Sequence, residues 1–153
     1  MSGQINVNKL AARSGNTITV NSGDKLYAPG HVIQVVSGTL TSAATGTGTS
    51  IVDTGLTATI TPTSTSSKIY VNGYITLGTQ SFFVYCWLVR GSTQIFKADA
   101  AGSRPRTTFA APPYAGGNEI YAVEAMPFQY LDSPSTTSAV SYTHLTLPTI
   151  LLV

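Results

Sequence analysis

Apolar side chains recur at every second position along most of this chain, and no segment places them at helical spacing over three turns. Successive side chains of a strand point to opposite faces of a sheet, so this pattern indicates strands. Turn-forming segments such as "NSGD", "RGS" and "AGGN" separate the apolar runs. The sequence therefore predicts an all-β fold, an antiparallel β-sandwich of jelly-roll type preceded by a short extended N-terminal β segment.

The expected strands cover residues 5–10, 17–20, 31–37, 56–62, 68–78, 81–91, 93–98, 106–112 and 119–131. Residues 1–30 bring too few large apolar side chains for a core of their own, so we expect them to form an extended, trimerising segment. Residues 31–139 are the expected sandwich domain. The strand at 81–91 is apolar on both faces, so we expect it at the centre of a sheet.

The chain has 153 residues, a net charge of +2 and only 9% charged residues. Its cations are spread along the sequence, which argues against nucleic acid as a partner. No window approaches the roughly 18 apolar residues of a membrane span, and the N-terminus lacks a secretory pattern, so we expect synthesis in a cytoplasm and no membrane insertion. Cys86 lies in the run "FFVYCWLV" and is expected to pack as a core residue.

No motif predicts a catalytic residue, a cofactor site or a metal site. The glycines of "GTGTS" at 46–50 are not followed by the lysine of a phosphate-binding loop, and His31 has no ligating neighbours in sequence. The six acidic residues are scattered, although two distant carboxylates can still converge as a glycosidase pair. That alternative stays open at this point.

Aromatic and basic residues supply the candidate contact positions. Phe83, Tyr85 and Trp87 lie on one face of the strand at 81–91, and they form either a subunit interface or part of the core. Tyr114 lies in the loop "PPYAGGN", where it either stacks against a sugar or anchors the loop. Arg104 and Arg106 are further candidates for contact with a ligand at the surface.

Several blocks of the sequence resemble the C-terminal domains of tail-fibre and other virion proteins of bacteriophages, of a kind common in aquatic viruses. They are "APGHVIQVV", "DTGLTATITPTSTSSKIYV", "LVRGSTQI" and "YLDSPSTTSA". The opening "VNKLAARSGNTITVNSGDKL" resembles the short β repeats that lead into such domains. The resemblance covers most of residues 5–139, and its motifs are structural rather than catalytic.

This resemblance implies a β-sandwich displayed on a virion after synthesis in the host cytoplasm. It implies a homotrimer that contacts other virion proteins and a host cell-surface glycan or protein, with no cofactor. Adhesion by such a protein is non-enzymatic and multivalent, because weak contacts are multiplied over several copies. Two alternatives are a fibre-borne polysaccharide depolymerase and a purely structural virion or assembly protein.

The last residues depart from that pattern. "VSYTHLTLPT", at 140–149, resembles the translated adapter of transposase-based sequencing libraries, and the next four residues and the stop fit the continuation of that adapter. We therefore expect residues 140–153 to be non-native and the native C-terminus to be lost after about Ala139. Ser141 and His144, whose spacing suggests a hydrolase, then carry no function. We expect this tail to extend a strand at a vacant sheet edge as far as about His144.

Overall fold

The computed structural model describes residues 11, 14–15, 17, 19–22, 30–45, 50–78, 83–112 and 123–148, with side chains as far as His144. These residues contain strands and no helix, which confirms the all-β prediction. The strands are β1 (Val52–Ile60), β2 (Ile69–Gly78), β3 (Val84–Arg90), β4 (Thr93–Ile95), β5 (Phe109–Ala111), β6 (Val123–Asp132) and β7 (Val140–Pro148).

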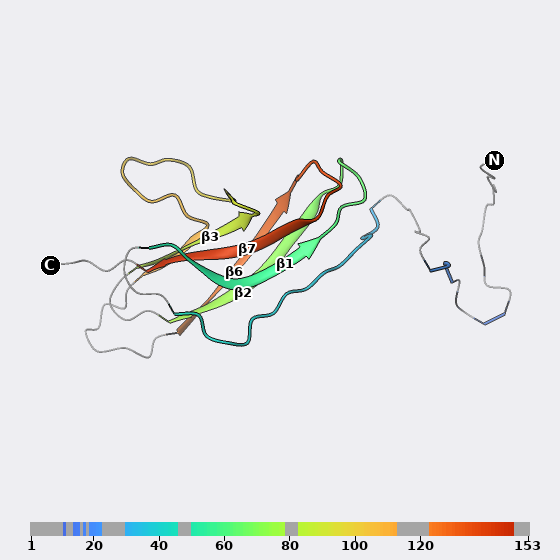
Figure 1. Cartoon of the computed structure of the whole chain (residues 1–153), viewed down its shortest axis with the longest axis horizontal. Coiled ribbons are helices and arrows are strands. Elements are labelled where there is room, and N and C mark those ends of the chain that lie inside the picture. The colour runs from blue at the N-terminus through green and yellow to red at the C-terminus, as the bar shows by residue number, and fades with distance from the viewer. Residues whose placement is uncertain are drawn as a thin grey trace. The chain divides into compact units, whose positions relative to one another are not determined.

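The strands form two antiparallel sheets. In the larger sheet β7 lies between β1 and β3, while β4 and β5 pair with different parts of the other edge of β3. Figure 1 shows β7 in red between β1 and β3. The smaller sheet consists of β2 and β6, which pair without a break from Ile69 with Asp132 to Gly78 with Val123.

The core lies between these two sheets, as the predicted sandwich requires. Leu88 of the larger sheet is fully buried and packs in one cluster with Ile69 and Phe128 of the smaller sheet. The same cluster takes in three more buried side chains, Ile95, Val140 and Tyr142. In most strands every second residue faces this core, and the residues between them face outward. Burial of one face of each strand therefore explains the alternating pattern of the sequence.

β3 is the most deeply buried strand. It pairs along both edges, and Cys86, Trp87, Leu88 and Val89 are all buried, so the expectation of a central strand is confirmed. Cys86 lies on the same face of β3 as Leu88, the face toward the core, whereas Trp87 and Val89 lie on the other face. A strand enclosed on both faces needs consecutive apolar residues, and "VYCWLV" supplies them.

Gly73 fits beneath an aromatic ring on the inner face of the smaller sheet. It pairs with Phe128, and a Cβ atom placed on Gly73 would come within 2.9 Å of the Cζ atom of that ring. The absence of a side chain thus lets the Phe128 ring lie over β2, where it joins the core.

The tail strand is central, not peripheral. β7 pairs with β1 from Ile60–Val140 to Val52–Thr146, and with β3 from Arg90–Tyr142 to Val84–Pro148. The expectation that the tail occupies a vacant sheet edge and stops near His144 is therefore wrong. An alternating segment can fill the gap between two strands because ladder hydrogen bonds use only backbone groups.

The predicted strand at 31–37 is also wrong. The chain divides into two compact units, Met1–Val35 and Val36–Val153, and residues 31–37 carry no strand in either. Val32 and Val35 are 68% and 84% exposed. A run of β-branched apolar residues alone does not make a strand, because a strand also needs a neighbouring chain with which to pair. The predicted strand at 5–10 lies outside the described residues, and those described within 17–20 have no regular structure.

The remaining differences concern strand ends. β1 begins at Val52, earlier than predicted, because Gly55 with a φ of 80° allows a register shift between Asp53 and Thr57 within the strand. The strands predicted at 93–98 and 106–112 shrink to Thr93–Ile95 and Phe109–Ala111. Residues 96–108 between them form a long connection, which we call the excursion.

Candidate functional site

The excursion is the loop between β4 and β5, drawn in yellow in Figure 1. Its two arms are joined by a hydrogen bond from the amide of Ala98 to the carbonyl of Thr107, at 3.0 Å. Near its tip the amide of Arg104 donates to the carbonyl of Ala101, and Gly102 supplies the positive φ of 60° that this reversal needs. The excursion is therefore closed on itself rather than extended.

Hydrogen bonds also fix the excursion to the buried strand β3. The indole Nε1 of Trp87 donates to the carbonyl of Arg106 at 2.6 Å. Thr108 donates its amide to the carbonyl of Cys86 and accepts the amide of Leu88 on its hydroxyl, at 2.9 and 2.8 Å. Because the partners on β3 are buried, these bonds hold the base of the excursion in one place.

The side chains on the excursion are unusually charged for this chain. Lys97, Arg104 and Arg106 are exposed there, with Asp99 as the single carboxylate. Arg106 donates its Nε–H to the carbonyl of Ala98 at 2.7 Å, a bond that orients the guanidinium and does not use its two terminal nitrogens. Such a fork suits a carboxylate or a phosphate.

An aromatic side chain borders this basic segment. Phe96 is 40% exposed and stacks on Tyr130 of β6, with ring centroids 4.9 Å apart and an interplanar angle of 19°. Its φ of 47° is rare for a bulky residue. The stack fixes the position of a partly exposed ring, and Lys97 follows Phe96 in the chain.

The predicted contact residues are thus partly brought together. Arg104 and Arg106 lie on one excursion, while Tyr114 lies outside the described residues. Of the predicted interface residues, Phe83 is 45% exposed and stacks with Tyr85, whereas Trp87 is buried in the single chain. Sequence reasoning missed Phe96 and Lys97. The charge density of "KADAAGSRPR" at 97–106 was the signal that points to this segment.

A second exposed surface is the outer face of the β2–β6 sheet. Tyr70 and Tyr74 of β2 are 58% and 70% exposed there, and Leu131 and Val123 of β6 are 60% and 63% exposed. The outward residues between them are Asn72, Thr76, Ala125, Pro127 and Gln129. This face, which we call the tyrosine face, carries no charged side chain between the ends of the two strands.

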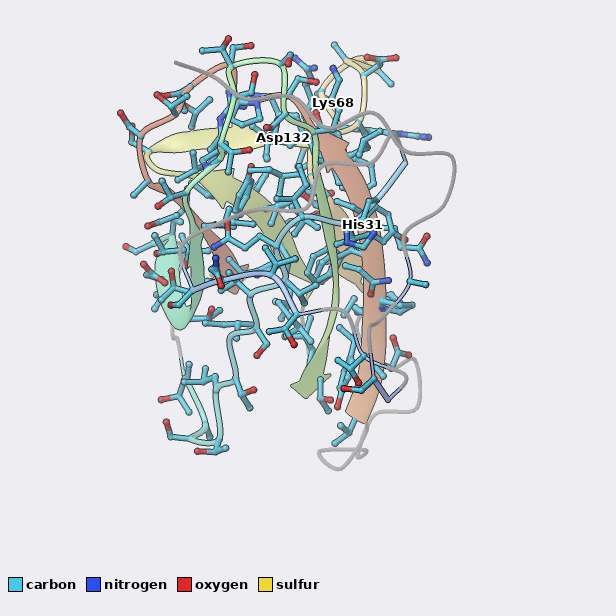
Figure 2. The ribbon with its side chains drawn as sticks, turned by 90° about the vertical axis from the view of Figure 1, so that its right-hand side faces the viewer. His31, Lys68 and Asp132 are labelled. Carbon is cyan, nitrogen blue, oxygen red and sulfur yellow. The ribbon has the colours of Figure 1, made fainter. Side chains whose placement is uncertain are left out.

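A polar network closes one end of the sandwich. Asp132 is buried and accepts hydrogen bonds from Arg90, at 2.8 and 3.0 Å, and from the Tyr142 hydroxyl at 2.6 Å. Burial and the bond to Asp132 raise the pKa of the Tyr142 phenol. Nearby, Lys68 donates to the Ser133 hydroxyl, and Figure 2 shows Lys68 and Asp132 at the same end of the smaller sheet. Both carboxylate oxygens of Asp132 are engaged in this structural network.

Ser141 and His144 do not form a nucleophile–base pair. Ser141 is exposed and its hydroxyl bonds to that of Thr59 at 2.7 Å, whereas His144 lies on the opposite face of β7. His144 is 4% exposed, packs against Phe128 at 4.5 Å between ring centroids, and has no hydrogen-bond partner for either ring nitrogen. Burial lowers its pKa from 6.5 to about 4.

Cys86 is equally unsuited to nucleophilic chemistry. Its side chain is fully buried, and burial raises its pKa to about 12. The reactive form of a cysteine is the thiolate, which is scarce at neutral pH when the pKa is this high. The prediction that Cys86 packs in the core is confirmed.

His31 is exposed in an irregular segment (Figure 2). Residues 46–49 of "GTGTS", together with Asp24 and Glu119, lie outside the described residues. Within the described ranges, no three His, Cys, Asp or Glu side chains form a group that would hold a metal ion. No helix in that part of the chain is long and apolar enough to cross a bilayer.

Comparisons with protein-family models, with curated proteins and with solved structures found no match to this chain.

Proposed function

We propose that this chain is a bacteriophage virion protein, a tail-fibre or receptor-binding domain that attaches the virion to the host surface without catalysis. The observation that carries the proposal is the excursion, on which exposed Arg106 and Phe96 are held by hydrogen bonds and ring stacking. A sandwich that fixes its contact groups in advance loses less conformational entropy when it binds. The resemblance of the sequence to virion proteins supports the same function.

Adhesion is tested by binding the full chain to a panel of bacteria from aquatic sources. Saturable binding to some strains, competed by their purified envelope polysaccharide, is the expected result. Failure to bind any strain would contradict the proposal and favour a purely structural virion protein. Release of sugar fragments from the envelope during incubation would instead favour a depolymerase.

The proposal includes a homotrimer, and the tyrosine face is the surface that best fits contact between subunits. Four large side chains on it are more than half exposed, and the absence of charge lets two copies approach without desolvating an ion. Interfaces are depleted in charge and enriched in tyrosine at their centres. A single weak site per subunit would then gain avidity from three copies.

Sedimentation of the full chain at micromolar concentration tests this arrangement. We expect a trimer that dissociates when Tyr74→Arg places a charge on the tyrosine face. Thr59→Arg, which changes an exposed position of β1 in the other sheet, is the matched control and is expected to leave the trimer intact. A monomeric wild-type chain would contradict the trimer.

We further propose that residues 140–153 are an adapter-derived tail that occupies the place of a native strand. The unpartnered nitrogens of His144 support this, because buried polar groups in natural cores almost always have a hydrogen-bond partner. The test is the same gene sequenced from a library prepared without transposase. It is expected to diverge after about Ala139 and to encode an apolar residue at the position of His144; an unchanged "VSYTHLTLPT" would contradict the proposal.

A further inference from the structure

We infer that the excursion binds an acidic polysaccharide, with Arg106 contacting a carboxylate of the sugar chain, Lys97 adding charge and Phe96 supplying a stacking surface. This inference rests on the proposed adhesive function and names the ligand class and the residues that recognise it.

Arg106 is the residue best prepared for an anion. Its backbone carbonyl accepts a hydrogen bond from the Trp87 indole N–H, and its Nε–H donates to the Ala98 carbonyl. Both its backbone and its side chain are therefore positioned before any ligand binds. The two terminal nitrogens of a guanidinium donate in parallel to the two oxygens of a carboxylate. Orienting the guanidinium in advance removes part of the rotamer entropy that a free arginine loses on binding.

The charge of the excursion indicates the sign of the charge on the ligand. The excursion holds three exposed cations and one carboxylate, whereas elsewhere Arg90 is paired with Asp132 and Lys68 is bonded to Ser133. In a chain with so few charged residues, this concentration makes the excursion the positive region of the described surface. An anionic ligand is therefore attracted there, and the attraction weakens with salt.

Phe96 indicates that the anion is carried by a molecule with an apolar surface. Its ring is 40% exposed and stacks on Tyr130. The C–H face of a sugar ring packs against an aromatic ring, while hydroxyl and carboxylate groups at its rim reach polar neighbours. Phe96 and the cation Lys97 are adjacent in sequence, so a polysaccharide that covers several sugar residues of surface can meet both.

The observations favour a polysaccharide over a nucleic acid. Tight binding to nucleic acid needs many phosphate contacts along a continuous basic track. The excursion offers three cations within residues 97–106 and places Asp99 among them. This arrangement suits a ligand whose charges are fewer and spaced by uncharged sugar atoms.

The inference is tested by calorimetric titration of the full chain with polygalacturonate, using dextran as the neutral polymer and a single-stranded DNA oligonucleotide as the phosphate polymer. We expect binding to polygalacturonate only, weakening as salt is raised. Arg106→Gln is expected to weaken it about tenfold, since one charge-assisted bidentate contact is lost. Lys97→Gln and Phe96→Ala are expected to weaken it less.

Lys68→Gln is the matched control, because it removes one exposed positive charge outside the excursion. It is expected to bind as the wild type does, and thermal melts of every variant show which of them remain folded. Lys97→Gln changes an exposed side chain and serves as the second variant if Arg106→Gln does not fold. Equal weakening by Lys68→Gln and Arg106→Gln, or binding to DNA as tight as to polygalacturonate, would overturn the site.

The two proposals fail in different ways. If the chain adheres to bacteria but Arg106→Gln and Lys97→Gln adhere equally well, the excursion is not the site and the adhesive function stands. If the chain binds neither bacteria nor polygalacturonate, both proposals fail.

Discussion

Replacing His144 with leucine should stabilise the protein and remove most of its sensitivity to mild acid. The neutral imidazole has one N–H donor and one acceptor nitrogen, and both are buried without partners. Each unsatisfied buried group costs about 1–3 kcal/mol, whereas leucine has no polar group to satisfy. Against the Phe128 ring, His144→Leu should therefore raise the free energy of unfolding by about 2 kcal/mol at pH 7.

The dependence on pH follows from the lowered pKa of His144. Its pKa is about 4 in the folded chain and 6.5 when exposed, so between these values the unfolded state binds the extra proton. Stability is then complete above pH 6.5 and falls as the pH is lowered toward 4. The full loss is about 3 kcal/mol, of which about 2 kcal/mol appears between pH 7 and pH 5.

Urea unfolding at pH 7 and pH 5 measures both effects. The leucine variant should be more stable at each pH and should lose much less stability between them. His31→Gln is the control, because His31 is the other histidine and is exposed. If His144→Leu destabilises the protein at pH 7, or if it retains the wild-type loss at pH 5, the imidazole is not buried and unpartnered as described.

Three further predictions test the fold. Gly73→Ala should cost about 1–3 kcal/mol in urea unfolding, because its Cβ atom would clash with the Phe128 ring; an unchanged midpoint would show that the ring is free to move. Cys86 should resist a maleimide at pH 7 until denaturant is added, and rapid labelling of the native chain would contradict its burial and its pKa of about 12. Deleting residues 140–153 should unfold the domain because β7 is lost from the middle of its sheet, while ending the chain after Pro148 keeps every β7 pair; a folded deletion variant would refute the central placement.

The sequence predicted the class of fold because alternation is a local property. A strand can be located from its own residues where one face is buried, because its apolar side chains then stand at every second position; β2 was predicted almost to the residue. The hairpin between β3 and β4 was equally visible, because "RGS" marks its turn, where Gly91 has a φ of 57°. These features depend on a few neighbouring residues.

The pairing of strands is not a local property, and the predictions that depended on pairing were wrong. Residues 31–37 include four β-branched apolar residues, a composition typical of strands, yet they are exposed and carry no strand. The tail was assigned to an edge, yet β7 lies between β1 and β3. Which strands become neighbours depends on contacts between residues far apart in the chain, and these contacts are not visible as a periodic pattern.

In the candidate site too, local features were predicted from the sequence and contacts between distant residues were not. The cations Arg104 and Arg106 were recognised from their charge and chain context, but the bonds that position Arg106 come from Trp87 and Ala98, which no motif connects to it. Phe96 was taken for a strand residue, and its surface position became visible only with its positive φ and its stack on Tyr130. Residue types indicate what a surface can bind, whereas the fold decides which of them meet.

A segment can satisfy the backbone of a sheet without satisfying its core, and β7 meets these two requirements unequally. Hydrogen bonds between strands involve main-chain groups only, so an alternating segment of suitable length can pair with both β1 and β3 whatever its origin. The inward side chains of such a segment must also fit the size and polarity of the core. Val140 packs in the core and Tyr142 reaches Asp132, but His144 brings two polar nitrogens to a position flanked by phenylalanine rings. In a strand that evolved with this core, we expect that position to carry an apolar side chain, because neither ring nitrogen of His144 has a hydrogen-bond partner there. The pairing of β7 therefore does not bear on its origin, whereas the unpartnered imidazole does.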